Sequence, residues 1–243
     1  MKEIQGWLHK TVMNYVEQIN NIQVKNGIKG NVVEIGIHHG KFFIPLAKLN
    51  SDGYNIAVDL FENQDENISR SGHGNKDIFL QHCFDHRLQN LRIISKNSMH
   101  LSENDFTTGN QKVRFFSVDG GHFTPEVLND LYLAEKSLHD DGVIIVDDFQ
   151  HPIWDDVFIS TIKYLKENDE LEPFLIGGNK LFLCKKKCKL YKNMHQTLSW
   201  EQYNNFLRTD YAERQSLKVR TANLLFPDLQ YFHENILDEW QPI

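Results

Sequence analysis

The spacing of apolar residues predicts one helix followed by alternating strands and helices. Between residues 2 and 24 apolar side chains recur every three or four positions, which is typical of an amphipathic helix packed on a larger body. From residue 30 onward, short apolar runs alternate with stretches of helical spacing. The runs predict strands at 31–36, 55–61, 90–98, 112–120 and 142–149, and the stretches predict helices at 41–49, 125–138 and 154–167.

This alternation predicts βαβ units and therefore a parallel sheet. The run GVIIVDDF at 142–149 follows the expected turn HDDG and lacks a polar alternation, as in a central strand covered on both faces. Thr124 is the expected N-cap of the next-to-last helix, with Pro125 in its first turn. Two apolar runs around Gly-Gly-Asn-Lys, within 173–186, predict a β-hairpin at the sheet edge. The predicted fold is α/β: Rossmann-like and doubly wound, mostly parallel, with an antiparallel C-terminal hairpin.

Composition fits one such core with additions. The chain has 243 residues, of which 40% are hydrophobic. We divide it into an N-terminal helical segment (1–28), a main domain (29–188) and an aromatic-rich C-terminal extension (189–243) packed on the same domain. The net charge of −7 argues against nucleic acid or an anionic membrane as the main partner. The absence of a long apolar run and the three cysteines favour a soluble protein of the reducing cytoplasm, with a homodimer left open.

Candidate ligand-binding residues follow the first three predicted strands. In an open parallel sheet, ligands bind outside the carboxyl ends of the strands. Glu34 ends the first strand, and Gly36 and Gly40 bracket the turn into a helix, where the backbone can approach a ligand closely. Because residue 34 is acidic and the spacing is G-x-x-x-G, this is not the dinucleotide fingerprint. Asp59 ends the second strand, where its carboxylate can accept hydrogen bonds from ribose hydroxyls. Ser98 ends the third strand, where its small polar side chain can contact the edge of an adenine.

Acidic residues follow the next two strands. Asp119 ends the fourth, and Asp147 with Asp148 ends the fifth. Neighbouring strands lie about 5 Å apart, so these carboxylates can converge on one Mg²⁺ or another hard divalent cation. His122 follows Asp119 in the stretch SVDGGH, and its ordinary pKa of about 6.5 suits a general base. The alternatives are a plain polar strand end and a histidine that caps the following helix.

Together these residues resemble a known family. The pattern Glu34-x-Gly36-x-x-x-Gly40, the acid at Asp59 and the closing hairpin resemble class I S-adenosylmethionine-dependent methyltransferases over residues 28–187. The resemblance implies that Glu34, Gly36 and Gly40 line the methionine part of S-adenosylmethionine, with Asp59 on the ribose. We also count Asp119, at the same edge, among the cofactor-binding residues. Residues 59–75 resemble a loop found in a branch encoded among sugar- and glycan-modifying genes.

A narrower resemblance concerns the chemistry. Asp119-x-x-His122 followed by Asp147-Asp148 resembles metal-dependent O-methyltransferases that act on sugar hydroxyls of macrolide-type natural products. It implies that the aspartates bind Mg²⁺ and that His122 takes the proton. We therefore expect methylation of a hydroxyl or phosphoryl oxygen on a small polar acceptor, such as a sugar, a nucleotide-linked sugar or a surface-glycan precursor, within polysaccharide or natural-product biosynthesis. Alternatives are a metal-independent methyltransferase of this fold, a nucleotide- or metal-binding relative with other chemistry, and a non-enzymatic scaffold.

Overall fold

The computed structural model describes residues 3–9, 11–192, 225 and 230–231. Most of the predicted C-terminal extension, 189–243, therefore lies outside the described residues. Within them, one eight-stranded sheet has the order β3-β2-β1-β4-β5-β7-β6-β8. The strands are β1 Asn31–Ile35, β2 Asn55–Asp59, β3 Leu91–Ser95, β4 Val113–Val118, β5 Leu138–Val146, β6 Leu171–Gly177, β7 Lys180–Lys185 and β8 Gln230–Tyr231. The α-helices are α1 Val12–Lys25, α2 Phe43–Lys48, α3 Lys76–Asp85, α4 Thr124–Ser137 and α5 Asp155–Glu167.

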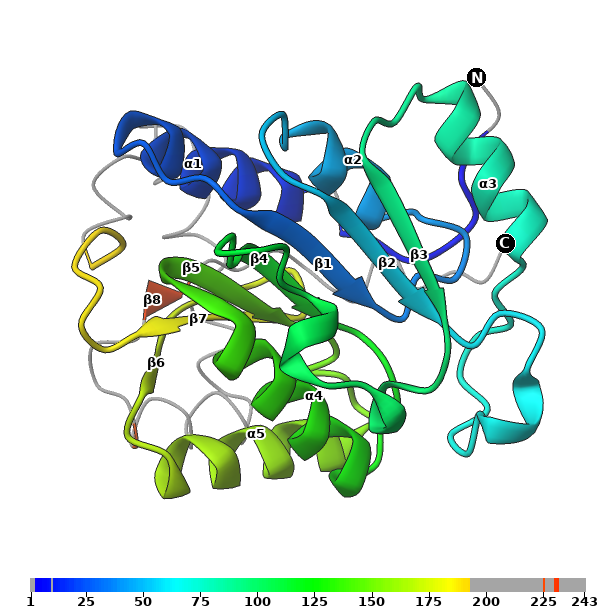
Figure 1. Cartoon of the computed structure of the whole chain (residues 1–243). Coiled ribbons are helices and arrows are strands. Elements are labelled where there is room, and N and C mark those ends of the chain that lie inside the picture. Colours follow the sequence, from blue (N-terminus) through cyan, green and yellow to red (C-terminus); the bar gives the residue numbers. More distant parts are fainter. Residues whose placement is uncertain (1–2, 10, 193–224, 226–229, 232–243) are drawn as a thin grey trace.

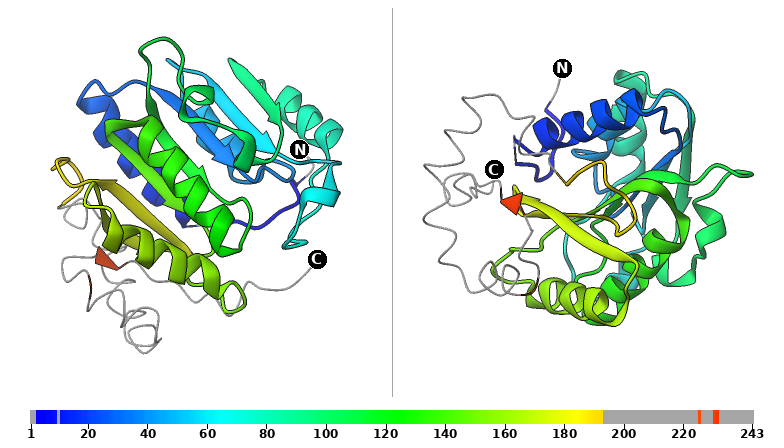
Figure 2. Two further views of the ribbon diagram at one scale, coloured as in Figure 1. Left: turned by 60° about the horizontal axis from the view of Figure 1, so that its bottom comes forward. Right: turned by 90° about the vertical axis from the view of Figure 1, so that its left-hand side faces the viewer.

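Helices cover both faces of this sheet (Figures 1 and 2). The side chains of β1 and β4 are buried along their whole length, which explains their unbroken apolar runs. Alternate residues point to opposite faces: Phe115 packs in a core with α1, whereas Phe116 packs in another core with α4 and α5. The predicted doubly wound α/β fold is confirmed.

The hairpin is also confirmed, with one difference in its place. β6 and β7 are joined by the two-residue turn Gly178-Asn179, whose φ angles of 58° and 66° suit glycine and asparagine. β7 lies antiparallel between β5 and β6. The outer edge of β6 pairs with β8, so the hairpin is one short strand away from the sheet edge.

The N-terminal prediction is wrong for its first turns. The helix begins at Val12, and residues 3–9 form a non-helical segment. Gly6 has a φ of 138°, which is outside the helical region, and Gly6 and Trp7 line the main pocket. Trp7 therefore lines the pocket, whereas Ile4 and Leu8 pack against the hydrophobic core, and none of the three lies on a helix.

Four smaller corrections concern element boundaries. The strand predicted at 142–149 starts at Leu138 and ends at Val146, with a register shift opposite β4, so no separate turn precedes it. Phe123, in extended conformation, is the N-cap of α4 instead of Thr124. Helix α3 was not predicted, although Asn75 caps it by accepting from the Ile78 amide (2.9 Å). Ser98 lies beyond β3, which ends at Ser95, and begins a 3₁₀ turn.

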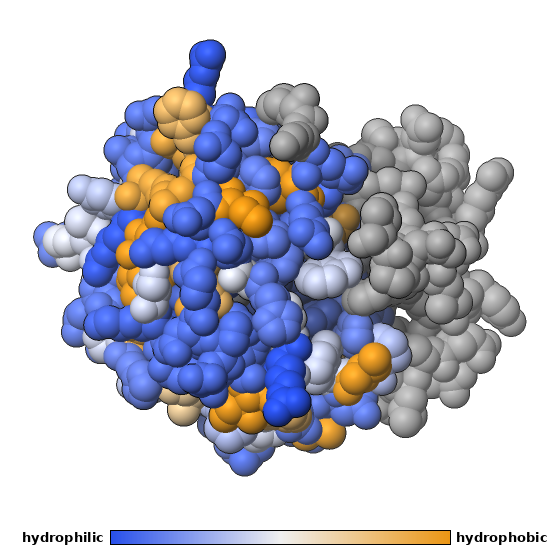
Figure 3. Space-filling model, turned by 90° about the vertical axis from the view of Figure 1, so that its right-hand side faces the viewer, coloured by the Kyte–Doolittle hydropathy of each residue, from blue (hydrophilic) through white to orange (hydrophobic). Residues whose placement is uncertain are grey.

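The outer face near α3 and the edge strand β3 is mainly hydrophilic, with separate apolar side chains (Figure 3). Phe84, on α3, is 79% exposed. Among the helices of the described residues, none is long and apolar enough to cross a membrane.

Candidate active site

A pocket of about 410 Å³ opens at the carboxyl ends of the parallel strands. Its position follows from the register, because Ile35, Val118 and Val146 end β1, β4 and β5 and pair side by side. Every residue that the sequence predicted for the site, except Gly40, lines this pocket. Those lining it are Glu34, Gly36, Asp59, Ser98, Asp119, His122, Asp147 and Asp148.

The first turn of the pocket requires glycine at residue 36. Gly36 has a φ of 90°, and an added Cβ would overlap the carbonyl oxygen of Asp119. Gly40 also has a positive φ, of 89°, but its neighbours are Ile44 and Phe79 at 3.0 Å. Gly40 therefore shapes the packing of α2 against α3 and does not reach the pocket.

Glu34 has an unusual electrostatic environment. Its side chain is only 2% exposed. Ser117 Oγ donates to Oε1 at 3.4 Å, whereas Oε2 is buried without a hydrogen-bond partner among the described residues. Burial raises the pKa of Glu34 to about 8, against the opposing effect of Lys180. The unpartnered oxygen Oε2 can therefore accept a hydrogen bond from a bound ligand.

Asp59 ends β2, and backbone amides hold it in place. Its carboxylate accepts from the amides of His38 (2.7 Å) and Phe61 (2.6 Å). Burial raises its pKa despite these hydrogen bonds. Ser98 is also buried and lines the pocket. The predicted contacts of Asp59 with a ribose and of Ser98 with an adenine stay predictions.

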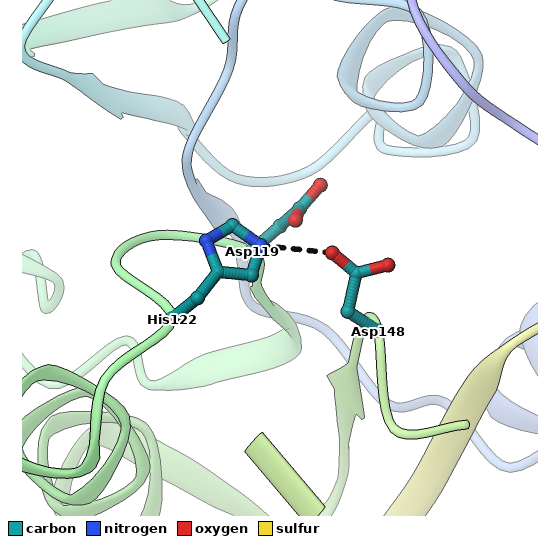
Figure 4. Close-up of side chains that lie close together, drawn as sticks. All are labelled: Asp119, His122 and Asp148. Carbon is teal, nitrogen blue, oxygen red and sulfur yellow. Dashed lines mark hydrogen bonds and ion pairs between the residues drawn. The ribbon is translucent and has the colours of Figure 1, made fainter. Parts of the chain in front are cut away.

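Acidic groups meet at the ends of β4 and β5 (Figure 4). One ligand atom each from Asp119, His122 and Asp148 lies within 4.8 Å of the other two. Burial, and then the charge of Asp147, raises the pKa of Asp119 well above its usual range. Several acidic side chains therefore gather at this edge of the pocket, where a cation would be favoured.

His122 is fixed through both ring nitrogens. Its Nε2 lies 2.8 Å from Asp148 Oδ2, and its Nδ1 lies 3.0 Å from Ser71 Oγ. Although burial acts in the opposite direction, the hydrogen bond from His122 brings the pKa of Asp148 below its ordinary value. The imidazole packs 4.5 Å from the ring of Trp154. His151 and Trp154 also line the pocket.

Asp147 is held differently from Asp148. Its Oδ2 accepts from the Nζ of Lys180, a residue that is 1% exposed. Lys180 Nζ also lies 4.6 Å from the centre of the Phe42 ring. Asp147 is not among the three residues whose ligand atoms converge, so its predicted role as a metal ligand stays a prediction.

Sequence reasoning missed Ser71 and Lys180. Ser71 lies in the glycine-rich stretch SGHGN, and only the fold brings that loop to His122. Lys180 could have been noticed in the sequence, because it is a charged residue between two apolar runs that both form buried strands.

A comparison with protein families finds a match over the parallel strands of the sheet. Residues 33–149 match the family model of a methyltransferase domain. The match spans 117 of the 243 residues, just under half of the chain. With the fold, this match confirms the prediction of a class I S-adenosylmethionine-dependent methyltransferase. No curated protein sequence matches the chain.

Solved structures share the fold at low sequence identity. The O-methyltransferase NovP has a TM-score of 0.58 at 13% identity, covering 73% of this chain and 80% of NovP. CalS11, a TDP-rhamnose 3'-O-methyltransferase of calicheamicin biosynthesis, has a TM-score of 0.51 at 13% identity, covering 74% and 83%. TomG from Streptomyces achromogenes, an O-methyltransferase of tomaymycin synthesis in complex with S-adenosylmethionine, has a TM-score of 0.52 at 13% identity, covering 72% and 80%.

The Gly36 turn provides a test of the cofactor site. We expect Gly36→Ala to weaken S-adenosylmethionine binding at least about tenfold, because the backbone must move away from Asp119. Gly27→Ala is the matched control, since Gly27 also has a positive φ, of 69°, but has no atom within 4 Å of an added Cβ. Isothermal titration calorimetry with both variants measures the difference. Equal affinities in the two variants would contradict the assigned role of Gly36.

Proposed function

We propose that this methyltransferase transfers the methyl group of S-adenosylmethionine to an oxygen of a small polar acceptor, assisted by a divalent cation such as Mg²⁺. The observation that carries the proposal is the convergence of Asp119, His122 and Asp148 beside the Glu34–Gly36 turn in one pocket. A sugar, nucleotide-linked sugar or surface-glycan precursor is the proposed acceptor class. CalS11, which shares the fold, is described as acting on TDP-rhamnose.

The residues present fit the cofactor. S-adenosylmethionine carries an ammonium and a sulfonium and no phosphate. The unpartnered Oε2 of Glu34 suits the ammonium, and the Asp59 carboxylate suits the ribose hydroxyls. Gly36 lets the backbone approach the methionine part without a side chain in the way.

The residues also fit a cation. The carboxylates of Asp119 and Asp148 offer ligand atoms within 4.8 Å of each other, close enough to share one ion, and Mg²⁺ usually leaves further positions to waters or substrate oxygens. A bound cation would lower the pKa of an acceptor hydroxyl and help to fix its position. Asp119 and Asp148 would hold the ion from neighbouring strands, next to the methyl donor.

His122 is the proposed base. An ionised Asp148 accepts from Nε2, which leaves Nδ1, on the side of Ser71, to receive the proton. Trp154 covers the imidazole and, with His151, bounds the acceptor side of the pocket. These contacts orient the base before the acceptor arrives, so less of the binding energy is needed for orientation.

A second candidate is metal-independent methyl transfer on the same fold. The buried ammonium of Lys180 favours it, because it brings a permanent positive charge to the acidic edge. Here Asp119 and His122 would position and deprotonate the acceptor without an ion.

Removal of metal separates the two candidates. With labelled S-adenosylmethionine and a panel of nucleotide sugars, glycans and phosphorylated precursors, we expect transfer that a chelator abolishes and Mg²⁺ restores. Chelator-resistant transfer would favour the metal-independent candidate. The absence of S-adenosylmethionine binding in calorimetry would overturn both.

The role of His122 is tested on the same reaction. We expect His122→Ala to lower kcat about 10²-fold or more, because proton removal would lack its base. The affinity for S-adenosylmethionine, measured by calorimetry, should remain within about twofold, which serves as the folding control. Unchanged kcat would contradict the assignment.

The raised pKa of Glu34 predicts a dependence of stability on pH. Since the folded pKa of about 8 exceeds the ordinary 4.5, the protonated side chain favours the folded state, and this contribution is lost as pH rises through that window. Relative to Glu34→Gln, the ligand-free wild type should lose about 1.4 kcal/mol of unfolding free energy per pH unit between pH 5 and 8. Denaturant titrations at several pH values measure it, and parallel curves would contradict the burial argument.

A further inference from the structure

The turn of the β6–β7 hairpin contacts both aspartates that follow β5. Gly177 and Lys180 close the turn as a strand pair, with Gly178 and Asn179 between them. The Asn179 carbonyl oxygen accepts from the Phe149 amide (3.1 Å). The loop after β5 is therefore attached by its backbone to the turn of a hairpin thirty residues further along the chain.

Asn179 orients Asp148. Its Nδ2 donates to Asp148 Oδ1 at 2.7 Å, and its Oδ1 accepts from the Gln150 amide at 3.1 Å, so the orientation of the amide is defined. Asp148 has a φ of 55°, a conformation that non-glycine residues seldom adopt. The Asn179 contact and this backbone conformation turn the remaining oxygen, Oδ2, toward His122.

Lys180 and the backbone occupy Asp147. The Lys180 ammonium contacts Oδ2, and the Asp148 amide donates to Oδ1 at 2.8 Å. The Lys180 ammonium is almost completely buried, so water has little access to it and does not readily replace Asp147 as its partner. A divalent ion on Asp147 would have to displace or approach this buried positive charge, which opposes binding there.

We propose that Asn179 and Lys180 are positioning residues that assign different tasks to the two adjacent aspartates. Asn179 holds Asp148 in the orientation in which it binds the cation together with Asp119 and contacts His122. Lys180 keeps Asp147 as its own counterion and out of the ligand set. This inference rests on the cation of the proposed function.

Binding of Mn²⁺, followed by calorimetry and by the electron paramagnetic resonance signal of the free ion, tests this division. We expect Asp148→Asn to weaken Mn²⁺ binding at least tenfold and Asn179→Ala about tenfold, as for the loss of an outer contact to a metal ligand. Asp147→Asn should stay within about threefold of wild type, because the amide oxygen can still accept from Lys180. Asn168→Ala, at the end of α5, is the matched control and should not differ from wild type.

The outcomes separate the two proposals. If wild type binds Mn²⁺ and the Asp147→Asn and Asp148→Asn variants both bind it equally less tightly, the division of tasks is overturned, whereas the proposed cation site is retained. No Mn²⁺ binding by wild type overturns the cation and this inference together. Should Asp147→Asn fail to fold, the double variant D147N/K180M removes both charges at once and makes the same comparison.

Discussion

The register of the central parallel strands is the constraint on which the site depends. Ile35, Val118 and Val146 lie side by side, so the residues that follow β1, β4 and β5 all emerge at one edge. The amide of Asp119 donates to the Ile35 carbonyl (2.9 Å), and that of Asp147 to the Val118 carbonyl (2.9 Å), which extends the ladder into the site itself. A shift of one residue in β5 would turn Asp148 away from His122 and toward the other face of the sheet.

This convergence concentrates negative charge, and the remainder of the site compensates for it. Glu34 and Asp119 have raised pKa values mainly because they are buried, whereas the His122 hydrogen bond favours ionised Asp148. Although burial opposes its charge, Asp147 and Asp119 keep the pKa of Lys180 above its ordinary value. One fixed ammonium lies beside several carboxyl groups, and a further cation, the role proposed for Mg²⁺, would balance more of their charge.

The antiparallel hairpin links fold and site. Its apolar side chains extend the two cores, with Leu181 and Leu183 facing one side and Phe182 the other. Its turn supplies Asn179 and Lys180 to the aspartates. The same six-residue strand therefore contributes packing along its length and polar contacts at its first residue, which explains a lysine within an otherwise apolar run.

Much of the architecture could be predicted from sequence, because burial on both faces leaves continuous Val, Ile and Phe runs and turns require Gly or Asn. Strand-terminal acids could be chosen for the same reason: parallel strands expose their carboxyl ends together, so Glu34, Asp59, Asp119 and Asp148 were identifiable. The start of α1 at Val12, the helix α3 and the start of β5 depended on tertiary contacts that local periodicity does not carry. Only the tertiary structure decided that Ser71 reaches His122, that Gly40 packs away from the pocket, and that Lys180 engages Asp147 rather than Asp148. Those pairings join residues 33 and 51 positions apart in the chain, or depend on side-chain direction, and spacing along a sequence determines neither.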